Sequence, residues 1–156
     1  MNIKENQIFN NLFVLEIANN HWGSLERGIK IINTYGRIVK ENGVRAAIKL
    51  QFRDPKTFIH KDYQDSEDIR YIKKTKQTYM SEKNLKKLIN QIKRVGALTM
   101  STPFDEESVQ TIKDFDLDLV KIASSDITDW PLIEKIGDLK KPTIVSTGGA
   151  QEVDLD

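Results

Sequence analysis

Five short apolar runs recur along this chain, and each ends in small or polar residues that lead into a helix-like segment. Each run is nearly continuous in apolar residues, which is typical of strands buried on both faces of a parallel sheet. The runs begin roughly 20–50 residues apart, with helix-like segments between them, as in repeated strand–helix units. This alternation predicts a parallel α/β fold. The five expected strands span residues 12–17, 45–52, 97–101, 118–122 and 143–146.

The segments between the runs carry helix-start residues followed by apolar residues at helical spacing. The first helix is expected to run from Ser24 to about Glu41, because Leu25, Ile29, Ile32 and Tyr35 repeat at the spacing of one helix face. Gly148 and Gly149 are expected to open a further helix after the fifth strand. Hydroxyl or acidic residues suited to capping begin the four clear helices: Ser24, Ser81, Asp105, and either Thr128 or Asp129.

A long polar stretch separates the second strand from the helix that begins at Ser81. It covers residues 53–80 and is too long for a plain connection inside a compact domain. We expect a short helix near residues 67–76 and a segment that folds over the functional site. The basic cluster of Lys73, Lys74 and Lys76 is interpreted as the solvated face of that helix.

Composition excludes several classes of function. The chain has 156 residues, with 24 Lys and Arg against 23 Asp and Glu, so a net charge of +1 gives no electrostatic footprint for nucleic acid. It has no cysteine, which excludes disulfides, thiolate chemistry and cysteine-type zinc sites. No run approaches the roughly 18 apolar residues of a membrane span, and the N-terminus lacks a signal-peptide core. We therefore expect a cytoplasmic protein with neither a membrane nor a nucleic-acid partner.

Polar side chains lie at or just beyond the ends of the apolar runs. Because the carboxyl ends of parallel strands meet on one side of the sheet, these side chains are expected to converge. Lysines would neutralise a ligand's charge, and hydroxyls would supply directed hydrogen bonds. The combination predicts a site for a small anion with two or three charges. The converging residues are Glu16, Lys49, Thr102, Lys121, Ser124 and Ser146.

The two lysines are the strongest part of this prediction. A lone lysine near a strand end is ordinarily a surface residue whose stem packs on the protein. Lys49 and Lys121 instead lie inside apolar runs, where a buried charge is costly unless it is paired. Glu16 has two alternative interpretations: a structural acid paired with one of these lysines, or a catalytic carboxylate that orients water or a substrate hydroxyl.

Histidine and glycine add weaker signals. His21 follows two asparagines in a turn, where a hydrogen-bonding structural role is the more common one. A metal site would need partners, and the only other histidine is His60, so we predict no metal site within this chain. The pair Gly148-Gly149 could cradle a phosphate through backbone N–H groups if a helix begins there.

Five segments in a fixed order resemble the N-terminal part of the sialic acid synthase family, which includes the N-acetylneuraminate, legionaminate and pseudaminate synthases. Each segment alone is a weak signal, and the five in order are quite specific. The segments are EIANNHWGS (16–24), IKLQ (48–51), STPFD (101–105), VKIAS (120–124) and LKKPTIVSTG (139–148).

The resemblance implies a (β/α)8 barrel of the TIM type. A complete barrel has eight units in about 250 residues. Residues 1–156 would supply only about the first five strands and four helices, without the C-terminal half of the barrel or the small antifreeze-like domain that many members carry. The first and fifth strands would then be open edges. The family also implies association, so a homo-oligomer is expected.

The family's reaction implies the ligands and a role for each matched residue. Its members condense phosphoenolpyruvate with an N-acylated hexosamine, such as N-acetylmannosamine, and release phosphate. A divalent metal, typically manganese, polarises the sugar aldehyde, and its ligands belong to later strands. By resemblance, Glu16 would lie by the reacting carbon or the attacking water. Phosphoenolpyruvate would be held by Lys49, Thr102, Lys121, Ser124 and Ser146, and the site would be shaped by Asn20, His21 and Asp126.

Three positions depart from the family pattern. Trp22 stands at a usually polar position, Ser125-Asp126 replaces a common Gly-Glu, and Gly149 stands where methionine is frequent. These positions lie on the side of the site where the sugar is expected, so the resemblance indicates phosphoenolpyruvate more firmly than it indicates the acceptor sugar. Two alternatives stay open: a related phosphoenolpyruvate-dependent or aldolase-type barrel, whose lysine forms a Schiff base, and a partial barrel that binds ligands without catalysis. We expect no complete condensation by this chain alone.

Overall fold

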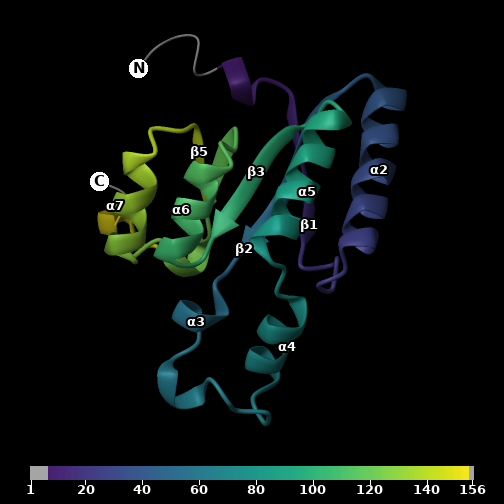
Figure 1. The fold of residues 1–156 in the computed structure, drawn as a ribbon. Coiled ribbons are helices and arrows are strands. Elements are labelled where there is room, and N and C mark those ends of the chain that lie inside the picture. Colours follow the sequence, from purple (N-terminus) through teal and green to yellow (C-terminus); the bar gives the residue numbers. More distant parts are fainter. Residues whose placement is uncertain (1–6, 155–156) are drawn as a thin grey trace.

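The computed structural model describes residues 7–154, which form an open sheet of five parallel strands flanked by helices (Figure 1). The strands follow one another in chain order, so every neighbour pair is joined by a crossover connection. This arrangement is half of a (β/α) barrel and confirms the predicted fold class. The strands are β1 (Leu12–Ala18), β2 (Arg45–Phe52), β3 (Leu98–Pro103), β4 (Leu119–Ile122) and β5 (Thr143–Val145).

Four longer helices cover the outer face of the sheet: α2 (Leu25–Asn42), α5 (Glu82–Arg94), α6 (Glu106–Asp114) and α7 (Trp130–Asp138). Three begin with the predicted cap, because the side chains of Ser24, Asp105 and Asp129 each accept a hydrogen bond from a backbone N–H in the first turn. Ser81 begins α5 as predicted, but its side chain makes no capping bond. No helix within residues 7–154 is long and apolar enough to cross a membrane.

Successive side chains along each strand point to opposite faces of the sheet. Ile48 and Leu50 of β2 point outward into the main core beneath the helices, together with Val120 of β4. Ala47 points inward and forms a second, smaller apolar cluster with Met100 and Leu119. The inner cluster lies toward the N-terminal ends of the strands, so the inner face changes from apolar to polar toward their C-terminal ends.

The N-terminal ends of the strands are closed by the 3-10 helix η1 (Gln7–Phe9). Ile8 of this turn packs on the inner apolar cluster. The guanidinium of Arg45 donates to the carbonyl oxygens of Gln7, Ile8 and Asn10 at 3.1–3.3 Å. The segment before β1 therefore plugs the base of the half-barrel.

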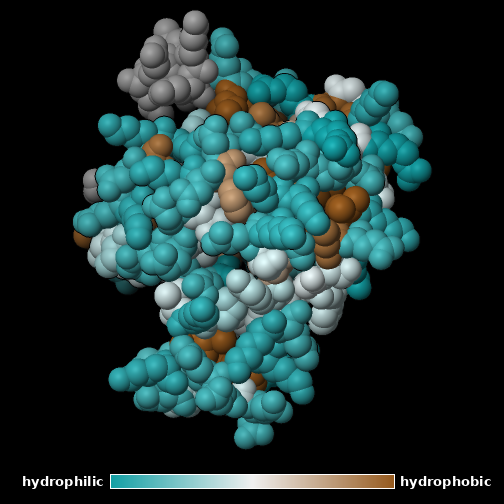
Figure 2. Space-filling model, in the orientation of Figure 1, coloured by the Kyte–Doolittle hydropathy of each residue, from teal (hydrophilic) through white to brown (hydrophobic). Residues whose placement is uncertain are grey.

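The connection between β2 and α5 projects beyond the C-terminal ends of the strands as a separate lobe, at the bottom of Figure 1. It contains α3 (Pro55–Phe58), the 3-10 turn η2 (Lys61–Tyr63) and α4 (Arg70–Thr78). The short helix expected near residues 67–76 is therefore present, shifted slightly toward the C-terminus. Figure 2 shows the outside of the lobe as largely hydrophilic, with hydrophobic residues toward its centre.

The helix predicted after Gly148-Gly149 does not begin there. Gly149 has a positive φ of 96°, which is incompatible with a right-handed helix, and the backbone N–H of Ala150 closes a turn on the carbonyl of Thr147. Only a 3-10 turn, η4 (Glu152–Asp154), follows within the described residues. The glycines make a turn after β5 instead of a helix N-terminus.

Candidate active site

Five of the six strand-end residues gather on the inner face, near the C-terminal ends of the strands. Side chains on a strand alternate between its two faces, so residues an even number of positions apart point to the same side. Each of the five lies an even number of residues from a member of the inner apolar cluster on or next to its own strand, so each points inward. In the β1–β2 register, Glu16 lies directly opposite Lys49. The five residues are Glu16, Lys49, Thr102, Lys121 and Ser146.

Lys49 links three strands at the centre of this cluster. Lys49 is only 8% exposed. Its ammonium forms an ion pair with Glu16 of β1 and donates a hydrogen bond to the Thr102 hydroxyl of β3 at 3.1 Å. These partners offset the cost of burying the charge. The other Glu16 oxygen accepts the backbone N–H of Ala18 at 2.8 Å, while the carboxylate keeps 43% of its side chain exposed. Glu16 is thus the paired acid, and it still faces solvent where a ligand would lie.

Lys121 of β4 is half-buried and has a different set of partners. Its ammonium donates to the Ser146 hydroxyl and, at 2.6 Å, to the carbonyl oxygen of Ile122. Burial lowers the pKa of Lys121, and the positive charge of Lys49 lowers it further, against the opposing effect of Glu16 and Asp126. Because no carboxylate within residues 7–154 forms an ion pair with Lys121, it is the less neutralised of the two cations. An anion between the lysines would be attracted to both.

The loop after β4 contributes Ser124 and Asp126 through the 3-10 turn η3 (Ser124–Asp126). One Asp126 oxygen accepts the Ser125 hydroxyl at 2.7 Å, and the other is buried without a partner. Ser124 is exposed and lies against the turn after β5, where a Cβ on Gly148 would be 3.4 Å from the Ser124 Cβ. The two loops therefore meet at the rim of the site.

Asn20 and His21 lie in the loop between β1 and α2, outside the lysine cluster. The Asn20 amide donates to the carbonyl of Ile17 at 3.0 Å. His21 is buried, and its Nδ1 accepts the backbone N–H of Gly23 at 3.1 Å. Burial lowers the pKa of His21, which favours the neutral ring that this acceptor role needs. Both residues fix the loop, and among the described residues neither forms a hydrogen bond with Lys49 or Lys121.

Within residues 7–154, no three acidic or histidine side chains gather as they would around a metal ion. His21 uses one ring nitrogen on the backbone, and His60 lies in the lobe, where its Nδ1 is 3.7 Å from Asp62. The residues that the structure describes therefore do not by themselves form a site for the divalent metal that the family implies.

Two residues near the cluster were not singled out from the sequence. Gln51 and Arg53 continue the inward alternation of β2 beyond Lys49, so the same two-residue period could have located them. The Gln51 amide oxygen accepts from the Asn19 side chain at 3.4 Å. The Arg53 guanidinium lies over the ring of Phe104, with its central carbon 4.0 Å from the ring centroid.

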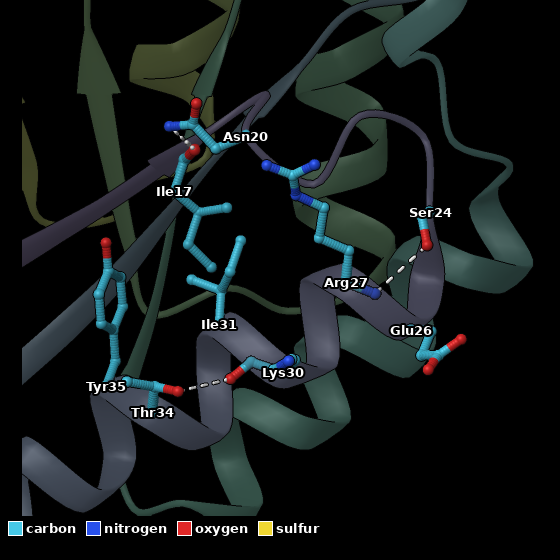
Figure 3. Close-up of a pocket in the computed structure, with 9 residues that line it drawn as sticks. All are labelled: Ile17, Asn20, Ser24, Glu26, Arg27, Lys30, Ile31, Thr34 and Tyr35. Carbon is cyan, nitrogen blue, oxygen red and sulfur yellow. Dashed lines mark hydrogen bonds between the residues drawn. The ribbon is translucent and has the colours of Figure 1, made fainter.

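A large hollow of about 650 Å³ lies away from this cluster, on the outer side of β1 along α2 (Figure 3). Figure 3 shows Ile17 and Ile31 facing each other in it, with the Tyr35 ring beside them. The Tyr35 hydroxyl donates to the Glu16 carbonyl at 3.1 Å. No inner-face lysine lines this hollow, so it marks the open flank of the edge strand β1 and is not the candidate site.

The fold and the cluster together define a class: an open segment of a (β/α) barrel whose strand ends carry two lysines with hydroxyl partners. A model of the NeuB family matches residues 37–156. The chain therefore belongs to the NeuB family, which confirms the resemblance found in the sequence.

Three relatives place the chain more closely. A pseudaminic acid synthase from Campylobacter jejuni is 35% identical over 150 residues, covering 91% of this chain and 42% of the relative. A Chromobacterium violaceum protein assigned to spore coat polysaccharide biosynthesis is 38% identical, with a TM-score of 0.89 over 94% of this chain and 44% of its own. A sialic acid synthetase from Leptospira borgpetersenii shares the fold, at 23% identity, a TM-score of 0.76, and coverage of 93% and 47%. The chain spans about two fifths of the length of the pseudaminic acid synthase.

Proposed function

We propose that this chain forms part of a synthase that condenses phosphoenolpyruvate with an N-acylated hexosamine, giving a nonulosonic (sialic-type) acid and phosphate. The observation that carries the proposal is the pair of inner-face lysines: Lys49 donates to a hydroxyl on the neighbouring strand β3, and Lys121 donates to one just beyond β5. Such a pair suits a small polyanion, and the Campylobacter jejuni relative is a pseudaminic acid synthase.

In this proposal, the cluster holds phosphoenolpyruvate and orients it. The phosphate and carboxylate are bound by Lys49, Thr102, Lys121, Ser124 and Ser146. Glu16, anchored by Lys49 and partly exposed, lies by the reacting carbon or the attacking water. Asn20, His21 and Asp126 shape the surrounding loops. The residues thus divide into charge carriers, hydroxyl donors and loop supports.

The reaction makes one carbon–carbon bond and breaks one phosphate ester. The enol carbon of phosphoenolpyruvate attacks the aldehyde carbon of the open-chain sugar, water adds to the resulting cation, and phosphate leaves. Lys49 and Lys121 stabilise the charge that develops on the departing phosphate. A divalent metal such as Mn²⁺ supplies polarisation of the aldehyde when it is bound in the complete enzyme, and the described residues do not form its site.

The extent of the chain bears on activity. We propose that residues 1–156 are the N-terminal portion of the catalytic barrel, because they match about two fifths of the pseudaminic acid synthase. On this proposal the chain acts in the cytoplasm, binds phosphoenolpyruvate, and needs the remaining strand–helix units, within a homo-oligomeric enzyme, for turnover.

The first test is an amide NMR titration of the chain with phosphoenolpyruvate. We expect dispersed resonances whose largest shifts lie near Lys49, Lys121 and Ser146. A folded chain whose spectrum ignores phosphoenolpyruvate would overturn the proposal and favour the non-catalytic binding module. A phosphate-release assay with phosphoenolpyruvate, manganese and N-acetylmannosamine is expected to show no sustained turnover by the monomer.

The lowered pKa of Lys121 favours one second candidate, an aldolase-type barrel. A lysine that forms a Schiff base must be deprotonated to attack a carbonyl. Borohydride reduction in the presence of pyruvate separates the two functions. A synthase leaves Lys121 unlabelled, whereas an aldolase gives a covalent adduct that mass spectrometry would locate on this residue.

A further inference from the structure

A second pocket lies beside the lysine cluster, between the β1–α2 loop, the end of β2 and helix α4. We call it the β2–α4 pocket. Its volume is about 260 Å³, and its lining includes Asn19, Trp22, Gln51, Arg53, Tyr71 and Lys74. The lobe between β2 and α5 therefore supplies one wall of a hollow at the C-terminal end of the sheet, where the sequence led us to expect a segment folding over the site.

The charge of this lining is one-sided. Arg53 and Lys74 both line the pocket, and no acidic residue does. Neither cation takes part in the ion pairs found among residues 7–154, and the Nε of Arg53 is buried without a hydrogen-bond partner. Unpaired cations that face one hollow raise the local concentration of anions. The pocket is therefore suited to a negatively charged group.

Arg53 is held in place by aromatic rings from three segments. Its guanidinium carbon lies 4.0 Å from the ring centroid of Phe104, 5.0 Å from that of Phe58 and 5.5 Å from that of Tyr71. Such contacts stabilise the cation and fix the plane of its fork without neutralising its charge. The guanidinium is thus pre-organised, and a ligand would not have to order it.

The other lining groups suit a sugar. Trp22 and Tyr71 leave about half of their surface exposed, at 52% and 53%, and a ring face of this kind packs against a pyranose or an open sugar chain. Asn19 and Gln51 place amide groups in the same lining, where they can bond to hydroxyl or acetamido groups. Apolar rings with a few convergent polar groups are typical of small-molecule sites.

The pocket also adjoins the reaction centre. Gln51 follows Lys49 by two residues on the same face of β2, a rise of about 7 Å. Ala18, which follows Glu16 by two residues on β1, lines the pocket as well. A ligand seated here can therefore extend one end toward the Glu16–Lys49 pair while its other end lies at Arg53 and Lys74.

We infer that the β2–α4 pocket binds the acceptor and selects one that carries a negative charge, that is, an N-acyl amino sugar bearing a phosphate or carboxylate group. Arg53 and Lys74 bind the anionic group, while Trp22, Tyr71 and the amides hold the rest of the sugar. The identification of this ligand as the acceptor sugar rests on the proposed function, whereas the preference for an anion rests on the pocket alone.

The test is isothermal titration calorimetry on the full chain with three probes: N-acetylmannosamine, its 6-phosphate, and N-acetylmannosaminuronic acid. We expect at least one charged sugar to bind about tenfold or more tightly than the neutral one, as charge-assisted hydrogen bonds require. Lys74→Gln and Arg53→Gln should each remove most of this preference. Lys73→Gln is the matched control, because Lys73 is exposed on the same helix and does not line the pocket.

Three results would overturn the inference: equal affinity for neutral and charged sugars, equal loss of the preference in the Lys73→Gln and Lys74→Gln chains, or inorganic phosphate binding as tightly as the sugar phosphate. Because Arg53 packs against three rings, its variant is first checked for a dispersed NMR spectrum, and Lys74→Gln on the exposed face of α4 decides the matter if Arg53→Gln unfolds. Phosphoenolpyruvate is titrated separately. Charged-sugar binding without phosphoenolpyruvate binding would reject the proposed function and keep the pocket's anion preference.

Discussion

The two ends of the same five strands are built on opposite principles. At the N-terminal end, the polar groups are satisfied within the fold. One Asp118 oxygen accepts both the backbone N–H and the hydroxyl of Thr99, at 2.8 and 2.6 Å, and the Asp118 N–H donates back to that hydroxyl at 3.0 Å. Arg45 spreads its charge over three carbonyl groups. This end joins β3 to β4 and closes the base of the half-barrel.

At the C-terminal end, charge is left partly unsatisfied. Among the described residues, Lys121 and Arg53 form no ion pair, and one oxygen of Asp126 is buried without a hydrogen-bond partner. Such groups cost stability unless a ligand completes them. The difference teaches that one end of the sheet supports the fold and the other is prepared for binding, a division that is general in (β/α) barrels.

The largest effect is expected from Lys49→Met, which tests whether the C-terminal end of the sheet serves binding. If the C-terminal end serves binding, losing this ammonium should weaken phosphoenolpyruvate affinity about 100-fold, since a charge-assisted hydrogen bond contributes about 1.5–3 kcal/mol. Stability should change by less than about 1 kcal/mol, because the freed Glu16 is partly exposed and can be hydrated. Calorimetry and urea denaturation measure the two effects. Lys40→Met on the exposed side of α2 is the control, and an unchanged affinity would place the anion elsewhere.

The opposite variant is Asp118→Ala at the N-terminal end. It removes the two hydrogen bonds that the carboxylate accepts from Thr99 and leaves the proton of the buried Thr99 hydroxyl without an acceptor, so we expect the free energy of unfolding to fall by about 2–3 kcal/mol. Phosphoenolpyruvate affinity of the folded fraction should stay the same. Asp68→Ala, in the exposed part of the lobe, is the matched control for urea denaturation. A loss of affinity with unchanged stability would contradict the division between the two ends.

The pH dependence of Lys121 sharpens the comparison. Its folded-state pKa is lowered below the ordinary value of 10.5, so the folded chain loses this proton before the unfolded chain does. Between the lowered pKa and 10.5, stability should therefore rise with pH while phosphoenolpyruvate affinity falls, by at most about tenfold per pH unit. Calorimetry in buffers of different ionisation enthalpy detects the linked proton uptake. Lys121→Arg should abolish that part of the pH dependence, and an unaltered profile in this variant would assign it to another group.

The smallest effect is expected from Arg45→Gln. The guanidinium is exposed, so losing its bonds to the segment before β1 should cost about 0.5–1 kcal/mol. Amide hydrogen exchange in residues 7–10 should quicken first, with phosphoenolpyruvate affinity preserved. Arg94→Gln, exposed at the end of α5, serves as control. Unaltered exchange would show that Ile8 alone holds the segment against the base.

Most of the fold could be predicted because strand and helix periods are local properties of the chain. The caps Ser24, Asp105 and Asp129 lie where their residue types indicated. The helix expected after Gly148-Gly149 was wrong, because a glycine pair marks a turn equally well. In that case the left-handed φ of Gly149 decided the outcome.

The site was predicted in outline, including a pairing of Glu16 with one of the two lysines, but the choice of Lys49 as that partner was not. Strand ends converge in any parallel sheet, so the gathering of Lys49, Thr102 and Lys121 follows from their positions. The partner of Glu16 depends on the β1–β2 register, which no local pattern contains. Arg53 escaped notice because the three rings around it come from separate segments, two of them in a stretch that resembled a polar connection.

The exposed flanks of the sheet have a consequence for assembly. Phe13 on β1 and Val145 on β5 are 56% and 44% exposed, and no strand among the described residues pairs with the outer edge of either. Two copies joined edge to edge around a common axis would form a barrel of ten strands, five from each copy. A barrel of about eight strands is the one whose interior is just filled by side chains. Counting strands therefore argues against closure of this sheet by a second copy of the chain at these edges.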